Sequence, residues 1–151
     1  MGKLMTGNPA ARELVTEILE KAQWWDVLKM IVQFLQAKDV EQVSVHFGFV
    51  IDRDLKGQPQ PEDEIVELSD LAAFIQRGMD EGTIEWARGS DFLFHPLGAE
   101  MEFMLCNDAD LHFASADSSL LLELGHTISS SGIKVYDSGQ FSVPYGAQKK
   151  S

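Results

Sequence analysis

The only cysteine of the chain lies in the stretch CNDADLHF, which runs from Cys106 to Phe113 and also holds two aspartates and a histidine. Thiolate, carboxylate and imidazole groups this close together are the side chains that bind zinc or form a nucleophile with its base. The same stretch places Asn and Asp between two apolar runs, which is typical of a β-hairpin turn. It is therefore either a small chemical site or a surface hairpin.

The register of this hairpin decides which side chains meet, because a slip of one residue moves every side chain to the other face. A turn of three residues pairs Cys106 with Asp110 and Met104 with His112, and it gathers the apolar side chains on the opposite face. A turn of two residues mixes polar and apolar side chains. We therefore predict the first register, which places Glu102, Cys106, Asp110 and His112 on one face.

Two properties of the stretch argue against chemistry. Structural zinc sites draw on closely spaced ligand pairs such as C-x-x-C, and this chain has one cysteine. A nucleophilic cysteine needs electropositive surroundings, whereas the neighbours here are acids. We interpret the stretch as a half-exposed hairpin with ordinary polar residues, and we assign no catalytic residue, metal ligand or cofactor. An alternative hypothesis is a small metal-dependent enzyme or sensor that uses Cys106, Asp110 and His112.

The charge of the chain is strongly negative and unevenly distributed. The net charge is −12, and residues 41–117 hold seventeen acids and four bases, while the regions on either side are close to neutral. Such a surface repels phosphate backbones, so nucleic acid is not expected as a partner. It attracts a basic protein instead, although an acidic surface also serves solubility alone.

These properties favour a non-catalytic binding protein that docks on a basic partner protein, as an inhibitor or an adaptor. Small bacterial immunity proteins, which neutralise basic nuclease toxins, share this size and charge, but no motif links the chain to them. The single cysteine favours a reducing, cytoplasmic setting, and no apolar run is long enough to span a membrane. The predicted partner-binding residues are Glu62, Asp63, Glu64, Asp108 and Asp110.

The N-terminal region has the pattern of an amphipathic helix. Asn8 followed by Pro9 is a typical helix start, and apolar residues then recur at helical spacing as far as Lys38. No glycine or proline interrupts this region, so one long helix and two shorter ones remain open. The apolar stripe serves either the core or a homodimer surface, because periodicity shows that a face is buried and not what buries it.

The remaining elements alternate between strand and helix signals. The stretch VSVHFGFVI has the clearest two-residue alternation, Asp117 is a predicted helix cap, and Gly82 and Gly132 are predicted helix ends. We therefore predict one α+β domain over 1–151, with flexible ends at about 1–7 and 146–151 and helices packed on a mostly antiparallel sheet. The expected strands are about 43–51, 83–87, 91–95, 100–106, 110–114 and 133–136, and the expected helices are about 9–38, 70–80 and 118–131.

Overall fold

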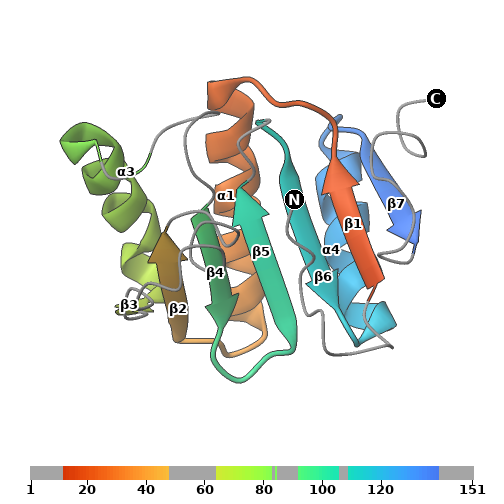
Figure 1. Ribbon diagram of the computed structural model, residues 1–151. Helices are drawn as coiled ribbons and strands as arrows, with labels where there is room; N and C mark the ends of the chain where they lie inside the picture. The colour runs from red at the N-terminus through yellow and green to blue at the C-terminus, as the bar shows by residue number, and fades with distance from the viewer. Residues whose placement is uncertain (1–11, 48–63, 83, 85–91, 106–108, 140–151) are drawn as a thin grey trace, which may run out of the picture.

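The computed structural model describes residues 12–47, 64–82, 84, 92–105 and 109–139. Within them, seven strands form one antiparallel sheet in the order β3-β2-β4-β5-β6-β1-β7 (Figure 1). The predicted α+β class is confirmed. The strands are β1 (Arg12–Thr16), β2 (Gln42–Phe47), β3 (Glu64–Glu67), β4 (Phe92–Pro96), β5 (Met101–Leu105), β6 (Leu111–Ser115) and β7 (Val135–Gly139). The helices are α1 (Lys21–Ala37), the 3-10 helix η1 (Leu68–Asp70), α3 (Leu71–Glu81) and α4 (Ser118–Ser130).

The main core lies between the helices and one face of the sheet. Figure 1 shows α1 and α4 side by side behind the strands, with α3 next to β3. A row of phenylalanine rings crosses the three central strands, with centroids 4.9 Å apart for Phe94 and Phe103 and 6.3 Å apart for Phe103 and Phe113. Because side chains alternate along a strand, the residues between these phenylalanines point to the opposite face.

The N-terminal helix predicted for 9–38 begins too early. The structure has a strand at Arg12–Thr16 and starts α1 only at Lys21. Leu14 and Val15 are consecutive and are 3% and 0% exposed, so both faces of this segment are buried, which suits a strand with two neighbours. Ile18, which the helical pattern placed in the apolar stripe, is 62% exposed.

The apolar stripe of α1 packs within the chain. The helix starts where the Gln23 side chain accepts a hydrogen bond from the backbone N–H of Glu20 at 2.8 Å. One face of the helix then reaches the sheet, so this stripe contributes to the core and not to a homodimer surface. The buried residues are Trp24, Val27, Leu28, Ile31, Phe34 and Leu35.

Helix α4 matches its prediction closely, and its one interior glycine has a clear role. Asp117 caps the helix, since its carboxylate accepts a hydrogen bond from the Leu120 N–H at 3.1 Å. A Cβ atom at Gly125 would lie 2.7 Å from Cδ1 of Leu14. Glycine therefore allows α4 to approach β1 closely, despite its cost of roughly 1 kcal/mol in a helix interior.

The other predicted elements are partly confirmed. The helix at 70–80 and the strands at 91–95, 100–106 and 110–114 are present within one or two residues, and the last strand begins at Val135. No strand is predicted at Glu64–Glu67, where the structure has β3, since four residues are too few for a periodic signal. The second half of the strand at 43–51, most of 83–87 and both predicted flexible ends lie outside the described residues. None of the described helices has the length and apolar character needed to cross a bilayer.

Candidate functional site

The hairpin that carries the histidine and aspartate has the predicted register. Met104 pairs with His112, and Leu105 pairs with Leu111. Ala109 ends the turn with φ of 69°, which is the left-handed residue expected at the end of a three-residue hairpin loop. Cys106 lies outside the described residues. The two-residue periodicity of the sequence was therefore enough to align these strands.

The interpretation of this hairpin as half-exposed is wrong. Asp110 and His112 are each 1% exposed. Strand β6 lies between β5 and β1, so residues of two neighbouring strands flank these side chains. Buried ionisable side chains need compensating partners, because removing a charge from water costs several kcal/mol.

Glu13 on β1 provides one of these partners. Its Oε2 lies 2.7 Å from Nδ1 of His112, and Oδ1 of Asp110 lies 3.2 Å from the other ring nitrogen, Nε2. Glu13 is 7% exposed, so the three groups form one buried cluster that joins residues about a hundred positions apart. Sequence reasoning missed Glu13 because it assigned this segment to a helix, and no local pattern connects it to His112.

The surroundings of this Glu13–His112–Asp110 cluster are apolar. Val15 and Met104 pair with His112 on either side, and each is 0% exposed. A neutral imidazole has one N–H, so one of its nitrogens would direct a lone pair at a carboxylate oxygen. A charged imidazolium interacts favourably with both carboxylates, through a hydrogen bond to Glu13 and at ion-pair distance from Asp110, which makes it the form of His112 that this geometry favours.

The arrangement of the cluster differs from that of a metal centre. In the described ranges, no three His, Cys, Asp or Glu side chains are placed so that they could hold a metal ion. Each ring nitrogen of His112 lies within 3.2 Å of a carboxylate oxygen of a different residue. The hypothesis that Cys106, Asp110 and His112 bind a metal therefore gains no supporting observation.

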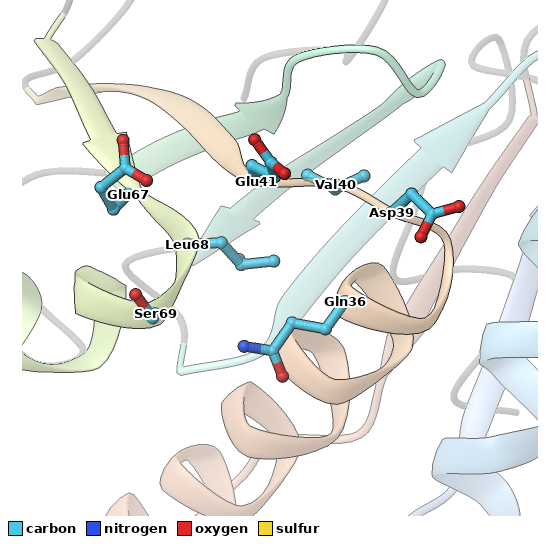
Figure 2. A pocket seen from close by; sticks show the side chains of 7 residues that line it. All are labelled: Gln36, Asp39, Val40, Glu41, Glu67, Leu68 and Ser69. Atoms are coloured by element: carbon cyan, nitrogen blue, oxygen red, sulfur yellow. The ribbon is translucent and has the colours of Figure 1, made fainter.

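A second feature is a hollow of about 320 Å³ between the end of α1 and the start of η1, which we call the α1–β3 hollow (Figure 2). Figure 2 shows Gln36 on the last turn of α1 and Ser69 on η1, with Leu68 pointing into the space between them. Three carboxylates lie around the hollow, and none of the described residues that line it is basic. The lining residues are Gln36, Asp39, Val40, Glu41, Glu67, Leu68 and Ser69.

The end of α1 adds to the negative potential of this hollow. The N–H groups of Asp39 and Val40 donate to the carbonyls of Gln36 and Leu35, both at 3.0 Å, which is a Schellman ending. Asp39 has φ of 65°, a conformation for which glycine is the usual residue. A carboxylate at a helix C-terminus also opposes the helix dipole. The nearby Lys38 is directed elsewhere, with its Nζ 2.9 Å from Glu123 on α4.

We expect Asp39→Gly to raise the free energy of unfolding by about 0.5–1 kcal/mol, because it removes both the strained backbone and the unfavourable charge. Urea unfolding at pH 7 measures the change. Asp39→Asn is the matched control, since it removes the charge and keeps a side chain at positive φ. A stability of Asp39→Gly at or below that of the unmodified protein would contradict this account.

Of the predicted partner-binding residues, the structure describes Glu64 and Asp110. Glu64 is exposed on β3, the same edge strand that carries Glu67 of the hollow. Asp110 is inside the sheet, next to His112, and its carboxylate is not available on the surface. Glu62, Asp63 and Asp108 lie outside the described residues. Sequence reasoning missed Asp39 and Glu41, whose only signal was their position just after the helix.

Comparison with models of protein families, with curated proteins and with solved structures gives no match for this chain.

Proposed function

We propose that the protein is a non-catalytic binding protein that docks on a basic partner protein, and that the α1–β3 hollow receives a lysine or arginine side chain of that partner. The observation that carries the proposal is the set of exposed carboxylates from Asp39, Glu41 and Glu67 around one hollow at a helix C-terminus. The net charge of −12 supports it, because a charge of this size also steers a basic protein toward the surface.

The shape of the hollow fits a long basic side chain. Val40 and Leu68 line it and are 6% and 2% exposed, so they provide an apolar floor below the acidic rim. Lysine and arginine have an aliphatic stem and a charged end. The stem would contact the apolar floor, and the charged end would contact the acidic rim. The partial negative charge at the helix C-terminus destabilises the carboxylates of Asp39 and Glu41. These carboxylates would gain a counter-charge when the partner binds.

The test compares two triple variants that change the net charge by the same amount. We expect wild-type protein and the control variant to retain the same basic proteins from a lysate of the native organism at low salt. The hollow variant is expected to retain them at least tenfold less, because the removed charges face the partner's cation directly. The hollow variant is Asp39→Asn, Glu41→Gln and Glu67→Gln, and the control is Asp26→Asn, Asp80→Asn and Glu100→Gln.

Two outcomes would contradict the proposal. Equal losses in both variants would show that overall charge, and not the hollow, governs retention. Undiminished retention by both variants would exclude docking through these acidic residues. Wild-type retention is also expected to fall as salt rises, since exposed charges are screened over about 10 Å at 0.1 M salt.

We propose that the protein acts as an inhibitor of the immunity-protein kind, or as an adaptor, in a bacterial cytoplasm. It is supported by chain length, acidity and the presence of one cysteine, and by no motif.

A further inference from the structure

We propose that Glu13, His112 and Asp110 form a proton-dependent clamp that holds strand β1 in the sheet while the imidazole is charged and weakens when the imidazole loses its proton. The clamp is separate from the α1–β3 hollow and does not depend on the binding function. It links the first described strand to β6, which lies next to it in the sheet.

The geometry of the clamp places both ring nitrogens beside carboxylate oxygens, which favours the charged imidazolium. The Nδ1 atom is 2.7 Å from Glu13 Oε2, a distance at which two unprotonated atoms repel each other. The Nε2 atom is 3.2 Å from Asp110 Oδ1, which is within ion-pair range but without hydrogen-bond geometry. Loss of the proton therefore removes the attraction of one positive charge for two buried carboxylates.

The described strands next to the cluster bring no basic side chain to its face of the sheet, since Arg12 of β1 points to the opposite face and pairs with Asp137 of β7. On the same face of the sheet, Glu102 of β5 and Glu13 both pair with Ala114, which neighbours His112 along β6. Tyr136 of β7 pairs with Val15 and is half-buried. Each of these further titratable groups is neutral or negative at neutral pH, and a negative charge favours the imidazolium.

The position of β1 explains why the clamp has a structural consequence. Strand β1 lies between β6 and the edge strand β7, so a weaker hold on β1 also weakens the attachment of β7. A further polar contact between β1 and β6 is the hydrogen bond from the Leu111 N–H to Oγ1 of Thr16, at 3.0 Å. That bond does not change with pH in this range.

The sign of the pH dependence follows from proton linkage. The folded state holds the proton of His112 more tightly than the unfolded chain, in which histidine has a pKa of about 6.5. The contribution of the clamp to stability is therefore fully present below about pH 6.5, and it is lost as the pH rises through the value at which folded His112 deprotonates. The carboxylates that dominate acid titration lie below this window.

The test is an NMR titration of the histidine rings of the full chain from pH 6 to 9.5, with a chelator present. The ring nitrogen shifts report the charge state of each histidine. We expect His112 to keep its proton at least one pH unit higher than His126, an exposed histidine on α4 that serves as the internal control. Glu13→Gln is expected to lower the His112 midpoint by at least one unit, since it removes one carboxylate.

Hydrogen exchange of the backbone amides tests the structural consequence. Protection of the β1 amides of Leu14 and Val15, corrected for intrinsic exchange, is expected to fall at least tenfold across the His112 midpoint. Protection at Val43 and Val45 of β2, which lies near the other end of the strand order, is expected to fall less. A midpoint for His112 at or below that of His126, or equal loss of protection in both strands, would overturn the proposal. The comparison of His112 with His126 and the comparison of β1 with β2 both use the wild-type protein, so they remain valid even if Glu13→Gln does not fold.

Discussion

Phe103→Ala is expected to lower the free energy of unfolding by about 3–5 kcal/mol, a large loss for a single apolar residue. Phe103 is 0% exposed on the central strand β5, and its ring lies between those of Phe94 and Phe113. Truncation removes contacts with both neighbours and leaves a cavity in the middle of the sheet. Helix α1 and the rigid strands around the cavity limit how far it collapses.

Urea unfolding measures this loss, and Phe74→Ala on α3 is the matched control. Phe74 is only half-buried, so we expect it to cost less than half as much. If Phe103→Ala does not fold, Phe103→Leu keeps most of the volume and is expected to cost about 1–2 kcal/mol. A cost for Phe103→Ala no greater than that for Phe74→Ala would show that the phenylalanine row is not the centre of the core.

His112→Leu is expected to cost about 3–5 kcal/mol at pH 7, although leucine is apolar and of similar volume. The substitution removes the imidazole that lies between the carboxylates of Glu13 and Asp110, both of which are more than 90% buried. Removing one partner of a buried ion pair is strongly destabilising, whereas the loss of imidazole packing alone is minor.

A double variant separates charge from packing at this position. Glu13→Gln combined with His112→Leu is expected to recover part of the loss, because it also removes the charge of one of the two buried carboxylates beside the imidazole. His126→Leu on the exposed face of α4 is the control and is expected to change stability by less than about 0.5 kcal/mol. A cost for His112→Leu similar to that of this control would mean that the buried cluster does not contribute to stability.

Local patterns in the sequence predicted much of the sheet correctly. The pairing of Met104 with His112 follows from the alternation of polar and apolar residues on either side of a short turn. Helix α4 follows from its cap at Asp117 and the spacing of its leucines, and α3 from its apolar stripe and Gly82. In each case the decisive residues are within about fifteen positions of one another.

The candidate sites depended on contacts between distant parts of the chain. Glu13 meets His112 only because a segment with helical spacing pairs instead with β6 and β7, where burial on both faces outweighs local propensity. Asp39 and Glu67 come together only when the end of α1 lies beside η1.

The sequence by itself thus determined the class of the fold, the hairpin register, the later helices and the strong acidity of the chain. The tertiary structure decided that β1 is a strand, that His112 and Asp110 are buried, and which carboxylates surround the hollow. The physical reason is that spacing along a chain records which face of an element is apolar. It carries no record of which distant element will cover that face, and burial, charge pairing and cavities all depend on that element.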